Sequence, residues 1–183
     1  MKNEKLDIII IRGAPGTGKS RSAKCLAKLF PKGARIEIDN LRSMVISVDW
    51  TNQGEHINML NISTKLVYDF ITLGFRPVIV VDTFSNGKIV NYLDNLYQLN
   101  KNLSVHIFGL YTSEKELKRR IESRKKTEFR DYGICQRLND EVRKGKYSGE
   151  YQIDTTGLLP KETAKIIFDH LSDTSRPKES ISS

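Results

Sequence analysis

Eight consecutive residues near the beginning of the chain have the spacing of a phosphate-binding loop. They match the pattern Gly-x-x-x-x-Gly-Lys-Ser/Thr in full. Glycines let the backbone turn tightly and approach a ligand closely, so that amide N–H groups face the anionic oxygens of a phosphate. Lys19 adds a charge that can reach the β- and γ-phosphates, and Ser20 offers a hydroxyl ligand for Mg²⁺. We therefore expect a nucleoside triphosphate to bind at Gly13, Ala14, Pro15, Gly16, Thr17, Gly18, Lys19 and Ser20.

The residues on either side of this loop predict the elements that such a loop requires. Residues 6–11 form a short apolar run, which is typical of a buried parallel strand. After the loop, apolar residues recur at helical spacing on one face, at Ala23, Leu26, Ala27 and Phe30. The N-terminus of that helix would direct its positive end at the phosphates. A glycine-rich turn without a ligand is the alternative, and this strand–loop–helix order disfavours it.

Two acidic residues follow predicted strands and are candidates for the chemistry. Asp39 comes at the end of the strand predicted over residues 34–38, and Asp82 ends an apolar strand over residues 77–82. Ligands of open α/β sheets bind outside the carboxyl ends of the strands. We expect Asp39 to accept the proton of an acceptor hydroxyl, although it could instead cap the short helix that follows. We expect Asp82 to help hold Mg²⁺.

A basic segment late in the chain is a candidate lid. Ser113 and Glu116 form a capping-box pattern, so a helix is expected to begin there. Arg120 and Arg124 lie four residues apart, hence on one face of that helix, which leads into a polar, basic stretch. A lid of this kind would bring guanidinium groups onto a transferring phosphoryl group and exclude water. A solvated helix face is the alternative explanation of such a run of charge.

The remaining pattern predicts an α/β domain. Further strands are expected over residues 103–111 and 151–154, with helices between the strands and a final helix from Pro160. Strands that alternate with helices imply a parallel sheet covered on both faces. The 183 residues suffice for one domain, which we place at residues 1–171, and the serine-rich residues 172–183 are expected to be a disordered tail.

Composition narrows the partners and the compartment. No apolar run approaches the length of a membrane span or has a signal-peptide profile, so we expect no membrane partner. Two cysteines without metal-ligand spacing indicate a cytoplasmic protein rather than a disulfide framework. The net charge of +8 is consistent with a nucleic-acid partner or with a protein that handles several phosphates.

Three other residues are ambiguous in the sequence. Trp50, in the irregular stretch before the helix expected from His56 to Gly74, could cover an acceptor pocket or simply pack. His56 and His106 have no partner nearby in the sequence, so a structural or exposed position is the expectation for both.

Together, the loop, the two strand-end acids, the basic helix and the late Asp154-Thr155-Thr156 run resemble the small P-loop kinases. The branches most similar in pattern are shikimate and gluconate kinases, chloramphenicol phosphotransferase, zeta-toxin and polynucleotide 5′-kinase. The resemblance implies a three-layer P-loop NTPase sandwich with a five-stranded parallel sheet in the order 2-3-1-4-5 and a helical lid at about residues 118–135. It also implies ATP and Mg²⁺ as cofactors and transfer of the γ-phosphate to a hydroxyl.

The resemblance further implies roles for individual residues. Asp39 matches the acid that activates the acceptor, and Arg42, three residues on, matches a substrate-binding arginine. Asp82 matches the metal-linked carboxylate, and Arg120 and Arg124 match the lid arginines. The loop containing Thr155 and Thr156 matches the segment that borders the adenine. The sequence departs from the zeta-toxin and polynucleotide kinase pattern after Asp82, where Lys88 is the cation and the arginine of those branches is missing.

Three functions are therefore considered. The leading hypothesis is an ATP-dependent phosphotransferase whose acceptor is a small molecule or a nucleic-acid end. A polynucleotide 5′-kinase is favoured by the basic helix and the overall charge. A nucleotide-dependent ATPase switch without a small-molecule acceptor is disfavoured by Asp39 and by the lid-like segment.

Overall fold

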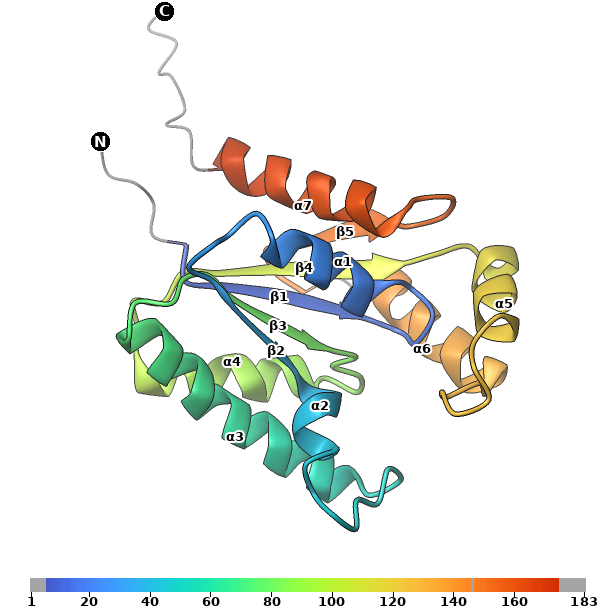
Figure 1. Cartoon of the computed structure of the whole chain (residues 1–183), viewed down its shortest axis with the longest axis horizontal. Helices are drawn as coiled ribbons and strands as arrows, with labels where there is room; N and C mark the ends of the chain where they lie inside the picture. The colour runs from blue at the N-terminus through green and yellow to red at the C-terminus, as the bar shows by residue number, and fades with distance from the viewer. Residues whose placement is uncertain (1–5, 146, 175–183) are drawn as a thin grey trace, which may run out of the picture.

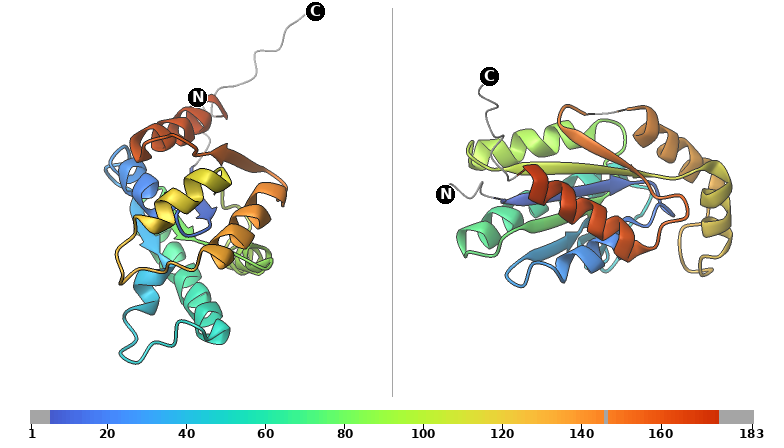
Figure 2. Two further views of the ribbon diagram at one scale, coloured as in Figure 1. Left: turned by 90° about the vertical axis from the view of Figure 1, so that its right-hand side faces the viewer. Right: turned by 90° about the horizontal axis from the view of Figure 1, so that it is seen from above.

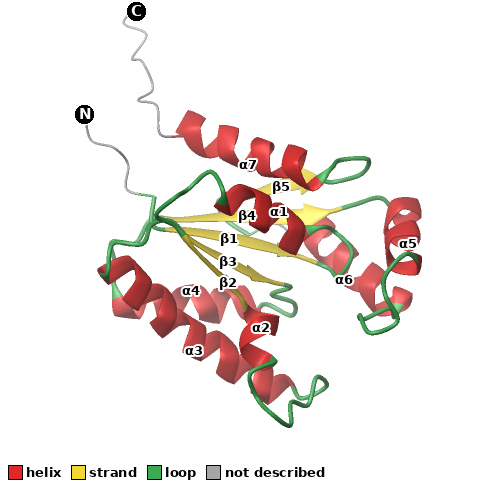
Figure 3. Ribbon diagram, viewed as in Figure 1, coloured by secondary structure: helices red, strands yellow, loops and turns green. Residues whose placement is uncertain are grey.

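The computed structural model describes residues 6–145 and 147–174, which form twelve helices and strands. The strands are β1 (Ile8–Gly13), β2 (Ala34–Glu37), β3 (Val78–Asp82), β4 (Val105–Tyr111) and β5 (Glu150–Asp154). The helices are α1 (Lys19–Ala27), α2 (Ile38–Arg42), α3 (Gln53–Thr72), α4 (Lys88–Leu99), α5 (Glu114–Glu122), α6 (Tyr132–Lys144) and α7 (Pro160–Thr174). Figure 3 shows that helices surround a single sheet.

The five strands form one parallel sheet in the order β2-β3-β1-β4-β5, which confirms the predicted fold class and strand order. Helices α1 and α7 cover one face of the sheet, and α3 and α4 cover the other. In Figure 1, α7 lies above the sheet and α3 below it, and Figure 2 shows the same layers from two other sides. The arrangement is the three-layer sandwich of the P-loop kinases.

The alternation of side chains along β1 explains why both faces are covered. Ile8 and Ile10 pack in the cluster beneath α3 and α4, whereas Ile9 and Ile11 pack in the cluster beneath α1 and α7. Successive side chains of a strand point to opposite faces, so an unbroken apolar run demands an apolar partner on each side. All four isoleucines are fully buried.

Strand register places the candidate acids at one edge of the sheet. Asp82 pairs with Arg12, one residue before the phosphate-binding loop begins, and Glu37 pairs with Val81. Asp39 follows two residues after Glu37, in the first turn of α2. The chain therefore brings Asp39, Asp82 and the loop to the carboxyl end of three adjacent strands.

Helix ends agree with the local capping chemistry. Ser113 accepts a hydrogen bond from the Glu116 N–H and begins α5, as predicted. Helix α3 begins at Gln53 rather than at His56, because Asn52 caps it by accepting from the N–H groups of Gly54 and Glu55.

The predicted lid and tail occupy the following places. Residues 118–135 comprise the end of α5, the connecting residues 123–131 and the start of α6. Helix α7 continues to Thr174, so residues 172–174, which were expected to begin a disordered tail, are helical. Residues 175–183 lie outside the described part of the chain. Among the described residues, no helix combines the length and apolar character needed to cross a bilayer.

Candidate active site

The loop between β1 and α1 has the backbone of a phosphate cradle. Gly16 and Gly18 have φ values of 92° and 91°, a region that residues with a Cβ rarely occupy. The Thr17 hydroxyl donates to the Ala14 carbonyl (2.9 Å) and closes the loop on itself. Gly18 is the N-cap of α1 and provides no side-chain cap, so the first N–H groups of the helix remain directed at the loop.

A cleft of about 720 Å³ opens above this loop. It is bounded on one side by α5 and the residues that follow it, and on another by the turn between β5 and α7. Most of the residues predicted from the sequence line it: Pro15, Gly16, Thr17, Gly18, Lys19, Ser20, Asp39, Arg120, Arg124 and Thr155. Gly13 and Ala14 form the buried start of the loop, beneath the cleft.

Lys19 experiences the charges of both strand-end acids. Burial lowers the pKa of Lys19, while the carboxylates of Asp39 and Asp82 act to raise it. The positive charge of Arg124 also reaches Lys19 and lowers its pKa further. The structure thus brings the loop lysine, the two acids and one lid arginine into a single electrostatic neighbourhood.

Asp82 is buried, with 5% of its surface exposed, and both of its carboxylate oxygens are engaged. His56 Nε2 lies 3.0 Å from Oδ1, and the N–H of Phe84 donates to Oδ2 at 2.7 Å. Burial acts to raise the pKa of Asp82, but these hydrogen bonds and the nearby positive charge outweigh it and the pKa is lowered. Asp82 therefore stays ionised at the edge of the sheet.

Arg120 reaches from α5 to the phosphate-binding loop. Its Nη1 lies 3.4 Å from the carbonyl oxygens of Gly16 and Thr17, and its Nη2 donates to the Thr155 carbonyl at 2.7 Å. Glu116, one turn earlier, accepts from Nε at 2.7 Å. The guanidinium group therefore ties α5, the loop and the β5–α7 turn together.

Arg124 has fewer protein contacts, and it follows the end of α5 at Glu122 rather than lying on that helix as predicted. Its Nη2 donates to Glu128 at 3.3 Å, whereas Nε is buried and has no hydrogen-bond partner among the described residues. An unpaired buried donor costs free energy unless a ligand or water satisfies it. Since Arg124 lines the cleft, a ligand anion there would supply an acceptor.

The structure does not bring Arg42 to the cleft lining. Its side chain is buried, its Nη2 donates to the Asp49 carbonyl at 3.1 Å, and its guanidinium carbon lies 4.7 Å from the centre of the Trp50 ring. Trp50 is half exposed and stacks on this arginine. Arg42 Nε is buried without a partner among the described residues, so Arg42 and Trp50 form a unit beside the cleft.

The two threonines of the β5–α7 turn differ. Thr155 is buried and lines the cleft, and its hydroxyl donates to the Thr17 carbonyl at 3.1 Å. Thr156 is not in the lining, because its hydroxyl accepts from the Ser113 N–H at 2.8 Å and also bonds to Asp154. Thr156 thus joins the beginning of α5 to the end of β5.

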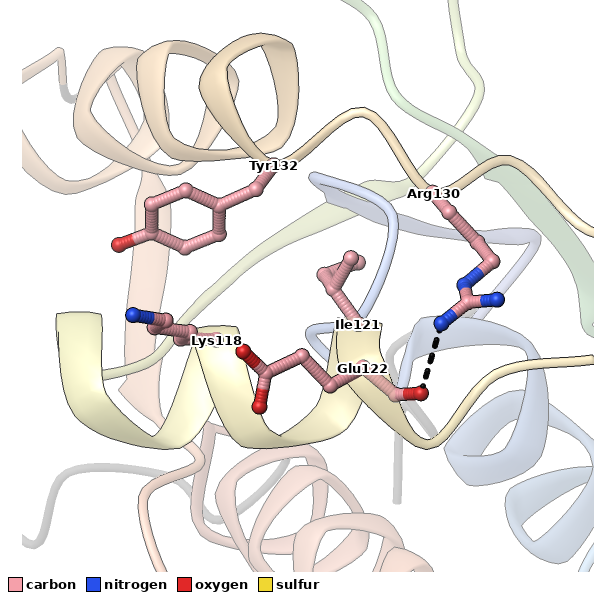
Figure 4. A pocket seen from close by; sticks show the side chains of 5 residues that line it. All are labelled: Lys118, Ile121, Glu122, Arg130 and Tyr132. Atoms are coloured by element: carbon pink, nitrogen blue, oxygen red, sulfur yellow. Dashed lines mark hydrogen bonds between the residues drawn. The ribbon is translucent and has the colours of Figure 1, made fainter.

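A second, smaller cavity of about 140 Å³ lies between α5 and the start of α6. Figure 4 shows Lys118 near the Tyr132 ring, with Ile121 between them and Arg130. Arg130 Nη2 donates to the Glu122 carbonyl at 3.0 Å. None of the loop residues lines this cavity, so it is separate from the phosphate cradle.

The oxygen donors present fit Mg²⁺. Among the described residues, no group of three or more His, Cys, Asp or Glu could hold a metal without other ligands. Mg²⁺ in nucleotide sites does not need such a cage, since phosphate and water oxygens complete its shell around one or two protein ligands. Ser20 is exposed in the cleft. Asp82 is not in the cleft lining, although its neighbour Thr83 is, and each oxygen of Asp82 retains a lone pair beyond its one hydrogen bond.

Two contributors to the site were missed by reasoning from the sequence. His56, expected to be structural or exposed, is buried and contacts Asp82, twenty-six positions away. Glu116 holds both Arg119 and Arg120, and hydrogen bonds from Arg119 and Arg120 lower its pKa to about 2 despite some opposition from burial. The i, i+3 and i, i+4 spacing of Glu116 to these arginines could have predicted its contacts. No pattern in the sequence predicts the contact of His56 with Asp82.

Comparisons with known proteins agree with this fold. The model of the AAA domain family matches residues 8–144. The comparison with curated proteins found no match. Among solved structures, the tunicamycin resistance protein of Deinococcus radiodurans is similar at 21% identity, with a TM-score of 0.66, over 91% of this chain and 96% of that one.

Two kinases of known structure are similar to the same extent. A gluconokinase from Sinorhizobium meliloti 1021 is 18% identical, with a TM-score of 0.62, over 93% of this chain and 94% of that one. Shikimate kinase from Acinetobacter baumannii, solved with shikimate, is 16% identical, with a TM-score of 0.62, over 93% of this chain and 96% of that one. At these identities the likeness concerns the fold.

Proposed function

Because the chain belongs to the AAA domain family and has the fold of the small P-loop kinases, we propose that it is an ATP-dependent phosphotransferase with a hydroxyl acceptor. The observation that carries the proposal is the composition of the main cleft. One cavity is lined by a phosphate-binding loop, a strand-end carboxylate and an arginine with an unpaired buried donor. These are the groups that phosphoryl transfer requires for binding, proton acceptance and charge stabilisation.

In this proposal, the loop amides and Lys19 bind the β- and γ-phosphates, and Thr155 and its neighbours border the base. Ser20 and Asp82 would hold Mg²⁺, which when bound neutralises phosphate charge. The acceptor oxygen forms a bond to the γ-phosphorus as the bond from that phosphorus to the β–γ bridging oxygen breaks. The hydroxyl proton passes to the Asp39 carboxylate, and ADP leaves. Arg124 stabilises charge on the transferred group, so positioning and electrostatics supply most of the acceleration.

The acceptor would lie beside Asp39, near the unit formed by Arg42 and Trp50. The buried Arg42 Nε without a partner supports its assignment as a substrate-binding group, reached when the residues around Trp50 rearrange on binding. The names of similar proteins suggest the first compounds to test, namely shikimate, tunicamycin and sugar acids. Nucleosides and aminoglycosides complete the panel.

The test is transfer of label from γ-labelled ATP to this panel by the wild type and by Asp39→Asn. We expect a labelled product with the wild type. The variant should bind ATP with unchanged affinity and lose transfer by about 10²-fold or more, because the amide cannot accept the proton. Transfer at the wild-type rate by Asp39→Asn would refute the base assignment. Slow ATP hydrolysis with no labelled acceptor would favour the nucleotide switch.

One observation favours a polynucleotide as the acceptor. Exposed cations cluster on α5 and on the residues that follow it: Lys118, Arg119, Lys125, Lys126 and Arg130. A surface that binds the phosphate backbone releases counterions, so affinity falls steeply as salt rises. Binding of a 5′-hydroxyl oligonucleotide at increasing salt tests this candidate, and an affinity independent of salt would remove it.

A further inference from the structure

Side chains of α3 and α4 form a chain of hydrogen bonds that ends on Asp82 of β3. Lys88, the first residue of α4, places its Nζ 3.1 Å from His56 Nδ1 and 2.6 Å from Gln53 Oε1. His56, in the first turn of α3, places Nε2 3.0 Å from Asp82 Oδ1. The His56 and Asp82 side chains are 8% and 4% exposed, so the contact between them is shielded from water.

The donors and acceptors in this chain select one tautomer of a neutral imidazole. A lysine ammonium has only donors, so Nδ1 of His56 must be the acceptor in the contact with Lys88. A neutral imidazole with a free Nδ1 carries its proton on Nε2, which then donates to the Asp82 carboxylate. Lys88 thereby selects the tautomer that can hydrogen-bond to the acid.

Lys88 occupies a position at which a positive charge is unfavourable, which supports a role in holding His56. The N-terminus of a helix is the positive end of its dipole, and cations are disfavoured there. Lys88 nevertheless occupies the first position of α4, partly buried, and no acidic residue is present in that first turn. Burial lowers the pKa of Lys88, and the Asp82 carboxylate acts against that shift. The Glu141 carboxylate acts in the same direction as Asp82, and the charge of Arg42 acts against both.

We propose that His56 is a positioning residue, held in its Nε2–H tautomer by Lys88, that orients the Asp82 carboxylate toward the magnesium of the bound nucleotide. The inference rests on the proposed function only in taking Asp82 as a magnesium ligand. With Oδ1 held by His56 and Oδ2 by the Phe84 N–H, the carboxylate is restrained at both oxygens, and one lone pair on each oxygen remains for the metal or its water.

The test measures ATP affinity with Mg²⁺ and with a chelator, in the absence of any acceptor. The magnesium-dependent gain in affinity should fall about 10-fold or more in His56→Leu, the range expected when a partner of a metal ligand is lost. ATP affinity with the chelator should not change. His56→Gln should restore most of the gain, because its amide nitrogen can donate to Asp82 while its amide oxygen accepts from Lys88.

Three further variants separate positioning from folding. Ser63 lies on α3, as His56 does, and Ser63→Ala removes a buried hydrogen bond to the Tyr92 hydroxyl of α4 (3.0 Å). This variant should leave the magnesium-dependent gain unchanged. In an Asp82→Asn background, His56→Leu should have no further effect, since it acts through the carboxylate. Nitrogen NMR of the imidazole should show a protonated Nε2 and an unprotonated Nδ1, with the Nδ1 signal displaced in Lys88→Met.

The outcomes are distinct. If His56→Leu shows the same magnesium-dependent gain in ATP affinity as the wild type, or if Nδ1 is protonated in the wild type, the inference is overturned. The proposed function is not affected by either result. If no acceptor in the panel is phosphorylated, the proposed function is refuted. The effect of His56→Leu on magnesium-dependent ATP affinity would remain valid. An absence of magnesium-dependent ATP binding in the wild type would overturn both.

Discussion

At the scale of single residues, the two arginines of the lid have different surroundings. The guanidinium group of Arg120 is surrounded by the carbonyl oxygens of Gly16, Thr17 and Thr155 and by Glu116. Arg124 lies one turn further along the chain and keeps an unpaired buried Nε. We infer that Arg120 mainly holds the phosphate-binding loop in shape, while Arg124 is the group available to a phosphoryl oxygen.

This difference predicts that one substitution mainly lowers stability and the other mainly slows phosphoryl transfer. Arg120→Ala should lower the free energy of unfolding by about 1.5–3 kcal/mol, the contribution of hydrogen bonds to a charged group. Arg124→Ala should leave stability within about 0.5 kcal/mol and slow phosphoryl transfer by about 10³-fold. Denaturant unfolding and turnover measure the two effects, with Lys115→Ala on α5 as the control. Equal losses of stability in both variants would contradict the distinction.

At the scale of elements, the phosphate-binding loop and the strand-end acids could be predicted because they depend on local sequence and parallel topology. The loop spacing is linear in the chain, and the carboxyl ends of parallel strands share one edge, so Asp39 and Asp82 had to lie near the loop. The contact of His56 with Asp82 depends on how α3 packs against β3 and α4, and no local pattern encodes that packing. The side-chain bonds of Thr156 likewise depend on the approach of β5 to α5.

On α5, one carboxylate binds two arginines of the same helix. Glu116 accepts hydrogen bonds from Arg119 at 2.7 Å and from Arg120 at 2.7 Å, and these bonds lower its pKa to about 2. A lowered folded-state pKa stabilises the fold above the ordinary carboxyl value and loses that stabilisation as the pH falls toward the folded value. The contribution of Glu116 is therefore complete above about pH 4.5 and declines between there and about pH 2.

The comparison of wild type with Glu116→Gln tests this pH dependence. The difference in melting temperature between the two should be largest at neutral pH and should shrink as the pH falls below about 4.5. Thermal unfolding monitored by circular dichroism from pH 7 to pH 3 measures it. A difference that stays constant over that range would show that the carboxylate charge is not what holds the arginines.

At the scale of the whole molecule, a buried ion pair joins the first strand to the last. Arg12 Nε donates to Glu150 Oε1 at 2.6 Å, its Nη2 donates to the Gly145 carbonyl at 2.7 Å, and the Tyr147 ring lies over the guanidinium group. Both side chains of the pair are almost completely buried. Gly109 of β4 lies between the strands of the pair. Its lack of a side chain leaves room for the Glu150 carboxylate, which a Cβ at that position would overlap. This pair fixes β5 and the end of α6 relative to the strand that leads into the loop.

Removing one member of the pair should therefore be costly. Glu150→Leu should lower the free energy of unfolding by about 3–5 kcal/mol, because it leaves the Arg12 charge buried without its partner. The double variant Arg12→Leu/Glu150→Leu should lose much less than the sum of the two single variants. Denaturant unfolding of the four proteins measures the coupling. Additive losses would contradict the view that the two charges depend on each other.

Every step of the proposed reaction depends on the binding of nucleotide phosphates by the β1–α1 loop. Calorimetric titration of ATP with Mg²⁺ into the wild type and into Lys19→Ala tests this most directly, with ATP turnover measured on the same samples. We expect one ATP to bind per chain of wild type, and we expect Lys19→Ala to lose turnover and to bind at least about 10-fold more weakly without a loss of stability. Equal ATP affinity in the two proteins, or no binding by the wild type, would contradict the account.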